Sequence, residues 1–361
     1  MRVLIDTTFA LRGPSGTGVY LARLIDALQP LGVEVVEAQN TARRAPAGGG
    51  WRSALNAGTD AWWTTVALPA RAAAVQADVI HHPLPAYAPR TRTPQVVTVH
   101  DLAFERVPEC FDPAFRRWAS ITHRTAARHA DAVVAVSHTT AMDVRARWGV
   151  PEERIVVARH GPGQEVDASR PRGGASHLLY IGDDEPRKNL GLLLAAHRLL
   201  RADVLTAAGT DAETAADRNA APPLVLAGTA RPPVGHPRAN DGIHVVDRPE
   251  PETLAALLND AIALVLPSLH EGFGLTAVEA MAAGVPVIAA RSPGLTETCG
   301  DAALYVDPYD PQDLAATIRR VTSDRALRAD LTERGRRQAA ELSWVRAARA
   351  HVRAYNLAAD G

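Results

Sequence analysis

Short runs of consecutive apolar residues recur along the whole chain, and the stretches between them carry apolar residues at helical spacing. In the first half these runs predict six strands, at 3–6, 33–36, 78–82, 95–100, 131–137 and 155–160. In the second half they predict six more, at 177–182, 223–228, 243–246, 261–268, 285–290 and 303–308. Runs that are apolar at every position and alternate with helices are typical of parallel strands covered on both faces. The pattern predicts an α/β chain with two parallel, Rossmann-like sheets.

A segment rich in Gly, Pro and Ser at 161–176 separates the two series of strands and indicates a domain boundary. We expect an N-terminal domain over 1–165, a linker over 166–176, a C-terminal domain over 177–344 and a final helix over 345–361. Two further segments stand out as insertions. The first, 42–76, contains Trp51, Trp62 and Trp63, and the second, 203–221, has the low complexity of a surface segment.

Composition narrows the class of protein. The formal net charge is −1, from 39 basic and 40 acidic residues, so nothing in the charge balance favours a nucleic-acid partner. Two cysteines, Cys110 and Cys299, make neither a disulfide scaffold nor a zinc cluster, and no apolar run is long enough to cross a membrane. We therefore expect a cytoplasmic protein. Only one basic residue, Lys188, is a lysine; the others are arginines.

The strongest candidate site follows the strand at 261–268, in the sequence SLHEGFGLTAVEAMAAG (268–284). Its glycines allow a ligand to approach the backbone closely, and Glu271 lies in the turn between them. A helix beginning near Leu275 would offer the free N–H groups of residues 275–277 to a phosphate. Glu279, one turn further on, could reach the next part of the same ligand, such as a ribose diol. The alternative is a capped helix with a surface glutamate.

A second candidate is YIGDDEPRKN (180–189), in which a strand delivers Gly182 to a polar turn. Arg187 and Lys188 are adjacent in this turn, and two neighbouring cations after a strand suit a diphosphate. The alternative is an exposed surface pair. The survival of a lysine here, in a chain that otherwise uses arginine, favours the phosphate role.

The N-terminal half offers weaker signals. SGTGVY (15–20) is a Gly-rich turn without the full GxGxxG pattern, so it predicts close approach to a ligand or a tight turn rather than NAD binding. His100 and Asp101 close a strand, where a histidine could contact an acceptor or a transferred group. His81 and His82 lack metal-ligand spacing, so a structural role is favoured there. Ser137 is expected to cap a helix.

Taken in order, SGTGVY, TVHDL, DAVVAVS, YIGDDEPRKN, LHEGFGLTAVEAMAAGVPVIA and GDAALYVDP resemble the retaining glycosyltransferases of family 4. The resemblance covers nearly the whole chain and is nearest to the mannosyltransferase-B-like branch. It implies the GT-B fold, with two facing Rossmann-like domains and a C-terminal helix that crosses back to the first. It also implies that the N-terminal domain binds the acceptor and the C-terminal domain binds the nucleotide-sugar.

The resemblance also implies roles for individual residues. Arg187 and Lys188 would hold the diphosphate, Glu271 would contact the transferred sugar, and His100 would lie near the reacting carbon. The expected donor-binding residues are Gly16, Gly182, Phe273, Gly274, Leu275, Thr276 and Glu279. The expected acceptor-binding residues are Asp101, His82 and Tyr20.

The chemistry expected from this resemblance needs no metal and no cofactor. The two cations and the helix N-terminus would stabilise the departing diphosphate, and the acceptor would attack from the same face of the sugar. The resemblance to this branch favours GDP-mannose as the donor, and a UDP-sugar is the alternative because similar enzymes use UDP-sugars. His270, Thr276 and the segment 244–252 depart from the common pattern and leave the base and the sugar open. The expected acceptor is a glycan, a lipid-linked molecule or a natural product.

Two questions stay open at this level. The tryptophans of 42–76, with arginines there and at 87–92, could form a peripheral membrane contact or cover the acceptor cleft. Other classes considered are a non-catalytic nucleotide-sugar-binding protein, a nucleotide-sugar epimerase, a pyridoxal-type phosphorylase, for which Lys188 is the sole possible Schiff-base lysine, and an NAD-dependent dehydrogenase.

Overall fold

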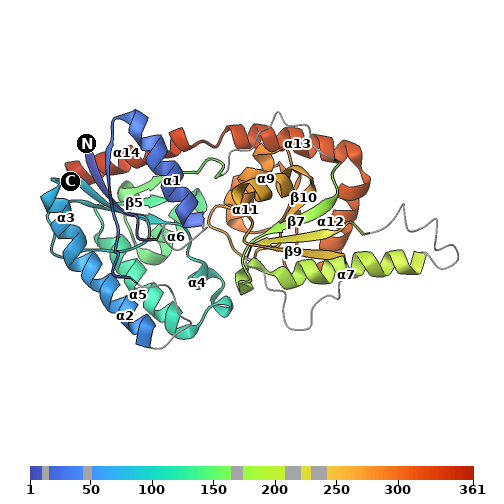
Figure 1. The fold of residues 1–361 in the computed structure, drawn as a ribbon, viewed down its shortest axis with the longest axis horizontal. Helices are drawn as coiled ribbons and strands as arrows, with labels where there is room; N and C mark the ends of the chain where they lie inside the picture. Colours follow the sequence, from blue (N-terminus) through green and yellow to red (C-terminus); the bar gives the residue numbers. More distant parts are fainter. Residues whose placement is uncertain (10–15, 44–50, 164–173, 208–220, 229–241) are drawn as a thin grey trace. The chain divides into compact units, whose positions relative to one another are not determined.

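The computed structural model describes residues 1–9, 16–43, 51–163, 174–207, 221–228 and 242–361. It divides into two compact units, one formed by Met1–Gly163 together with Ser343–Gly361 and the other by Gln164–Leu342. Most of the expected linker, most of the low-complexity segment and the start of the Gly-rich turn lie outside the described residues. Each unit contains one parallel six-stranded sheet, as the sequence predicts (Figure 1).

The first unit has the strand order β2-β1-β3-β4-β5-β6. Its strands are β1 (Arg2–Asp6), β2 (Glu34–Ala38), β3 (Val79–His82), β4 (Gln95–Val99), β5 (Ala132–Ala135) and β6 (Ile155–Val157). Its helices are α1 (Gly16–Leu28), α2 (Trp51–Trp62), α3 (Leu68–Ala74), α4 (Ala103–Arg106), α5 (Pro113–His129), α6 (His138–Asp143) and α14 (Trp344–Asp360). Short helical turns are η2 (Gln29–Leu31), η3 (Trp63–Ala67), η4 (Pro108–Cys110), η5 (Val144–Trp148) and η6 (Glu152–Arg154).

Successive residues of each buried strand point to opposite faces of this sheet and meet different helices. Val96 belongs to the apolar cluster that α1 and α14 cover, whereas its neighbour Val97 packs in the cluster that includes α5. The segment 42–76, read from the sequence as an insertion, contains α2, η3 and α3. Within it, Leu68 and Ala72 of α3 pack on Leu4 and Ile80 of the sheet in a small apolar cluster. Trp63 packs against this cluster and donates its indole N–H to Asp6 at 3.1 Å.

The C-terminal helix α14 is part of the first unit, as predicted (Figure 1). Ser343 caps it by accepting a hydrogen bond from the backbone N–H of Arg346. Its buried side is mostly alanine, which lets the helix lie close to its neighbours. The Trp344 indole donates to the Pro162 carbonyl at 2.8 Å, and a Cβ at Gly161 would lie 2.7 Å from the Trp344 backbone nitrogen. The start of α14 is therefore tightly seated beside the end of the first series of strands.

The second unit has the strand order β12-β11-β10-β7-β8-β9. Its strands are β7 (His177–Ile181), β8 (Leu224–Gly228), β9 (Ile243–Asp247), β10 (Ala261–Leu266), β11 (Val287–Ala290) and β12 (Ala303–Val306). Its helices are α7 (Leu190–Ala207), α9 (Pro251–Asn259), α10 (Leu275–Ala282), α11 (Pro293–Cys299), α12 (Pro311–Ser323) and α13 (Arg325–Ala340), with the turn η7 (Pro186–Lys188).

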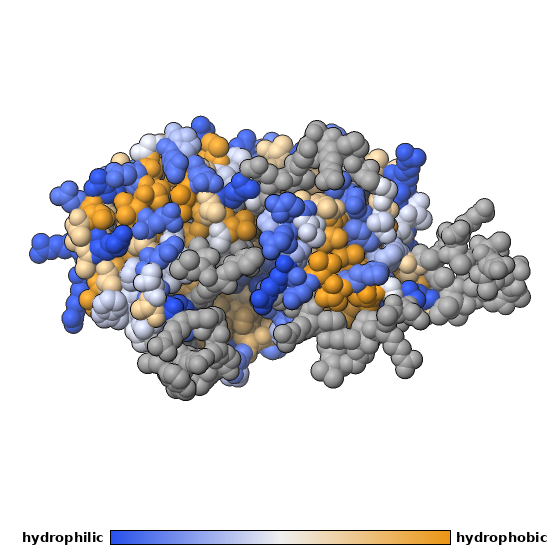
Figure 2. All heavy atoms as spheres, in the orientation of Figure 1, coloured by the Kyte–Doolittle hydropathy of each residue, from blue (hydrophilic) through white to orange (hydrophobic). Residues whose placement is uncertain are grey.

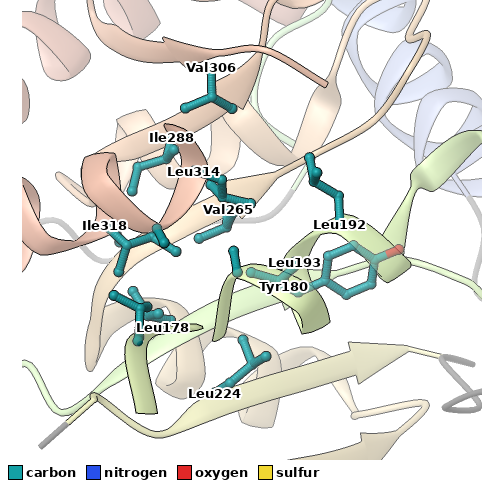
Figure 3. Close-up of a cluster of buried hydrophobic side chains, with 14 of the residues drawn as sticks. Leu178, Tyr180, Leu192, Leu193, Leu224, Val265, Ile288, Val306, Leu314 and Ile318 are labelled. Carbon is teal, nitrogen blue, oxygen red and sulfur yellow. The ribbon is translucent and has the colours of Figure 1, made fainter. Parts of the chain in front are cut away.

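Side chains from this second sheet meet α7 and α12 in a continuous apolar cluster (Figure 3). Leu178 and Val265 come from neighbouring strands, and Leu193 and Ile318 come from the two helices. Tyr180 lies at the edge of the cluster, where its hydroxyl donates to the Asp183 carbonyl at 3.2 Å (Figure 3). The cluster thus fixes the end of β7, from which the polar turn with Arg187 and Lys188 begins.

Hydrophilic and hydrophobic residues are interspersed on the face of the molecule shown in Figure 2. In the described part of the chain, no helix combines the length and the hydropathy that a membrane crossing needs.

Candidate active site

The candidate site of the second unit lies where its strand order reverses. β7 and β10 are paired neighbours in the sheet, although the strands β8 and β9 lie between them in the sequence. In open parallel sheets, ligands bind outside the carboxyl ends of the strands at such a reversal. Gly182 directly follows β7 and Ser268 follows β10, so both sequence motifs begin at this place.

Three charged side chains meet here. The ammonium of Lys188 lies 2.6 Å from one carboxylate oxygen of Glu271, and an Arg187 guanidinium nitrogen lies 3.6 Å from the other. All three side chains are mostly buried. Burial alone would raise the pKa of Glu271, but the charges of Lys188 and Arg187 outweigh it and lower this pKa to about 2. The alternative that Arg187 and Lys188 form an exposed surface pair is excluded, because both side chains are mostly buried.

The two motifs are also joined through the backbone. The Leu269 N–H donates to the Arg187 carbonyl at 2.8 Å. Asn189 adopts the left-handed conformation (φ 54°), and its side-chain amide donates to the carbonyls of Pro267 and Pro308 at 3.2 and 2.8 Å. Sequence reasoning gave Asn189 no role. Its one available signal was that asparagine tolerates left-handed backbone after a short helical turn.

Two glycines allow backbone segments to approach one another at the site. A Cβ at Gly294 would lie 1.9 Å from the Glu271 carbonyl oxygen, and one at Gly228 would lie 2.4 Å from the Gly182 carbonyl oxygen. Real Cβ atoms do not approach so closely, so only glycine fits either position. Both positions escaped sequence reasoning, because the contacts they allow join segments distant in sequence.

The N-terminus of α10 lies directly after Glu271. Gly274 precedes the helix with φ 88°, a conformation that favours glycine. In the described part of the chain, the backbone N–H groups of Leu275 and Thr276 have no hydrogen-bond partner. The expectation of a third free group is wrong, since the Ala277 N–H donates to the Gly274 carbonyl at 3.0 Å. The backbone N–H groups of Leu275 and Thr276 remain as donors for an anion. Phe273 and Glu279, which precede and follow them in the sequence, are buried.

In the first unit, His100 follows β4 and is half-buried. Its Nε2 lies 3.0 Å from the Pro83 carbonyl, which can only accept, so Nε2 carries the hydrogen. Burial lowers the pKa of His100, opposed by the Pro83 hydrogen bond and by Asp101, so the ring is neutral near pH 7. Nδ1 is then a bare acceptor with no hydrogen-bond partner in the described residues. Asp101 accepts from the Ala103 N–H and so supports the start of α4.

The ring of His100 is held by Tyr20, which it meets edge-on with centroids 4.9 Å apart. Tyr20 in turn belongs to a buried chain of hydrogen bonds that reaches α14. The His351 Nδ1 donates to the Ala347 carbonyl, so its Nε2 must accept, and this fixes the direction of every other bond. The chain of donors and acceptors runs from Tyr355 to His81, Thr98, Tyr20, His351 and Ala347, with every bond at 2.8–2.9 Å.

Four further residues of the first unit that the sequence singled out lie as follows. Gly16 is the exposed first residue of α1. Tyr20 and His82 are buried, and the Nε2 of His82 lies 3.1 Å from the Gln95 side-chain oxygen. The structure therefore gives both side chains core contacts, and their acceptor contacts stay predictions. Ser137 caps α6, as expected.

The buried histidines predict an acid-sensitive first unit. Burial lowers the pKa of His351 to about 4, and it also lowers the pKa of His81 and His160. The unfolded chain then binds protons that the folded unit does not, so stability is full above about pH 6.5 and falls as the pH drops below it. For His351 alone the loss between pH 7 and pH 5 is about 2 kcal/mol.

Tryptophan fluorescence is suited to measure this, because all six tryptophans lie in the first unit. In urea titrations at pH 7 and pH 5, His351→Gln should show a smaller loss of stability between the two pH values than the unsubstituted protein. The exposed His129→Gln is the control and should behave like the unsubstituted protein. An equal pH dependence in all three proteins would contradict the prediction.

Comparison with known proteins gives the class. The model of glycosyl transferases group 1 matches residues 164–338, and that of glycosyltransferase family 4 matches residues 14–162. Sucrose-phosphate synthase from Thermosynechococcus elongatus has a TM-score of 0.73 at 19% identity, covering 99% of this chain and 98% of that one. WaaG, a glycosyltransferase involved in lipopolysaccharide biosynthesis, has a TM-score of 0.69 at 16% identity, with both chains fully covered. The fold is that of the GT-B glycosyltransferases.

Curated relatives define the family. The glycogen synthase of Mycobacterium tuberculosis is 32% identical over 308 residues, which cover 79% of this chain and 70% of that protein. The O-antigen chain mannosyltransferase B of Escherichia coli is 28% identical over 78% of this chain and 74% of that protein. The protein belongs to glycosyltransferase family 4, as its motifs predict.

Proposed function

We propose that this glycosyltransferase moves a hexose from a nucleoside-diphosphate sugar to an acceptor hydroxyl, with retention of the anomeric configuration. The observation that supports this proposal most directly is the cluster of Arg187, Lys188 and Glu271 beside the two free N–H groups of α10. Two adjacent cations lie here, paired with Glu271 and, through Arg187 at 2.7 Å, with the more exposed Glu185. The helix N-terminus adds positive potential beside them. Such a place suits a diphosphate.

The chemistry follows from where charge develops. When the bond between the anomeric carbon and the diphosphate oxygen breaks, negative charge collects on the diphosphate. Arg187, Lys188 and the N–H groups of Leu275 and Thr276 stabilise that charge without a metal. The acceptor oxygen bonds to the anomeric carbon on the face that the diphosphate leaves, and the acceptor proton passes to the departing phosphate oxygen. Glu271, ionised at any pH above about 2, is then a fixed acceptor for the hydroxyls of the transferred sugar.

His100 has a separate role in this proposal. Its bare Nδ1 accepts a hydrogen bond from a hydroxyl of the transferred sugar, while Pro83 and Tyr20 hold the ring. The Nδ1 atom is the one unprotonated nitrogen of the ring, so a protonated or rotated His100 would lose this contact. Asparagine, which keeps an acceptor oxygen but lacks the ring, should restore part of the activity that alanine loses.

The donor and acceptor are proposed from the relatives. Besides the Escherichia coli protein, a relative named MMP alpha-(1->4)-mannosyltransferase from Mycolicibacterium hassiacum is 32% identical over 68% of this chain and 59% of its own length. These names favour GDP-mannose. A UDP-sugar is the alternative, since the Anabaena protein HepE, with the same fold at 17% identity, is described in complex with UDP and glucose. The proposed acceptor is a glycan, a lipid-linked molecule or a natural product.

The first test is binding and turnover of donors. A panel of GDP- and UDP-sugars is titrated while thermal unfolding is followed, with EDTA and then with Mg²⁺. A donor at a hundred times its Kd should stabilise the second unit by about 2.7 kcal/mol. We expect this shift with EDTA present, and we expect proton NMR of the released or transferred sugar to show the donor's anomeric configuration. A shift that requires Mg²⁺, or an inverted product, would overturn the corresponding part of the proposal.

A further inference from the structure

Helix α5 (Pro113–His129) carries large apolar side chains on the side that faces solvent. Phe115, Trp118 and Ile121 are 43%, 56% and 59% exposed. They follow one another at intervals of three residues, and the rings of Phe115 and Trp118 are in contact with centroids 6.0 Å apart. The side of the helix packed on the sheet is made instead by small residues, Ala119, Ala126 and Ala127. We call Phe115, Trp118 and Ile121 the α5 strip.

The same helix is strongly basic. Among its seventeen residues are four arginines and two histidines, with no aspartate or glutamate. Arg117, Arg124 and Arg128 are exposed and, at spacings of seven and four residues, share one side of the helix, next to the α5 strip. No ion pair involves these three arginines in the described part of the chain. We call them the arginine row.

This combination restricts the partner. A second copy of the same helix would bring two basic rows together, which opposes self-association through α5. An acidic partner would neutralise the charges of the arginine row, and an apolar partner would bury the α5 strip. An anionic bilayer offers both at once, because phosphate headgroups lie above acyl chains. Nucleic acid offers negative charge and bases that can stack on aromatic rings, but it offers no apolar surface that would bury the exposed isoleucine.

We propose that α5 binds the surface of anionic membranes, with the α5 strip at the boundary between headgroups and acyl chains and the arginine row on the phosphates. This inference is independent of the proposed function, because it uses no residue of the candidate active site. It also moves the membrane contact away from the tryptophans of 42–76. Trp63 packs on the core, and the α2 helix that ends in Trp62 carries one arginine and one aspartate.

Trp62 provides a matched control, since its exposed fraction of 55% nearly equals that of Trp118. The full chain is mixed with vesicles of phosphatidylcholine alone, or with 30% phosphatidylglycerol added, and bound protein is separated by flotation. We expect binding to the anionic vesicles that weakens as salt is raised. The double variant Trp118→Ser/Ile121→Ser should weaken it at least tenfold, Arg117→Glu/Arg124→Glu should abolish it, and Trp62→Ser should leave it unchanged. Circular dichroism checks that each variant is folded.

Several results would overturn the proposal. They are no binding to anionic vesicles, equal loss with Trp62→Ser, or unchanged binding in the Trp118→Ser/Ile121→Ser variant. If a single-stranded oligonucleotide displaces the protein from anionic vesicles at a concentration below that of the vesicle lipid, α5 would be reassigned to nucleic-acid binding. A dimer in sedimentation experiments that the Trp118→Ser/Ile121→Ser variant converts to monomer would reassign it to self-association.

Discussion

Replacing Lys188 with methionine is expected to lower kcat/KM by about a thousandfold, the effect of removing one donor aimed at developing charge. The ammonium of Lys188 lies 2.6 Å from a carboxylate oxygen of Glu271. In the proposed reaction its charge stabilises the departing diphosphate. Methionine keeps most of the side-chain volume and removes the charge. Steady-state kinetics with the donor identified by the binding panel measure the effect.

A loss of folding must be separated from this loss of chemistry. In Lys188→Met, Glu271 is a buried carboxylate left with Arg187 at 3.6 Å, so its pKa rises and the second unit loses stability. The double variant Lys188→Met/Glu271→Gln removes both charges of the pair and should recover much of this stability without recovering activity. Lys188→Arg should stay impaired, since a guanidinium does not replace a compact ammonium. Near-normal turnover by Lys188→Met would contradict the proposed site.

Replacing Gly294 with alanine is expected to destabilise the second unit by about 3 kcal/mol, the upper part of the range for overpacking. The new Cβ would lie 1.9 Å from the Glu271 carbonyl oxygen, so either α11 or the turn that carries Glu271 must move. For a unit of this size that corresponds to a fall in Tm of about 6–12 °C. The same movement displaces Glu271 from Lys188, so donor binding should weaken as well.

Gly191→Ala is the matched control, because a Cβ at that position of α7 would meet nothing within 4 Å. It should leave the second unit unchanged or stabilise it by about 0.5–1 kcal/mol, as alanine is the better helix former. Calorimetry follows the second unit, and tryptophan fluorescence follows the first unit as an internal reference. Equal Tm values for the two variants would contradict the prediction and would mean that the turn at Glu271 moves to accommodate the Cβ without a loss of stability.

The sequence was sufficient for the parts of this protein that depend on local pattern. Every predicted strand is present. The central strands are apolar throughout because both of their faces are covered. The edge strands β2 and β9 are only partly buried, and their short apolar runs were enough to predict them. Glu271 was singled out because it lies beside glycines in a turn directly after a buried strand, and Lys188 because it is the only lysine of the chain. The pairing of these two side chains with each other could not be read, since 83 positions separate them.

What the sequence did not show depends on contacts between distant segments. Gly294 reads as part of an ordinary helix start, and its requirement for glycine comes from the backbone of Glu271 alone. Tyr20 and His351 are 331 positions apart, and neither has a local signal for the hydrogen bond between them. The spacing of the α5 strip and of the arginine row can be seen in the sequence. Which side of the helix faces solvent, however, is decided by the sheet on which α5 packs.

The seating of α14 in the first unit has a consequence for synthesis of the protein. The sheet face that Ala348, Ala354 and Tyr355 cover is complete only after the ribosome has added the 179 residues of the second unit, Gln164–Leu342. At about 5–20 residues per second, this leaves an apolar face of the nascent first unit uncovered for about 9–36 s. The second unit, which is continuous in sequence, can finish folding before the first. During that interval the nascent chain presents a surface for chaperones or for aggregation that the finished protein does not have.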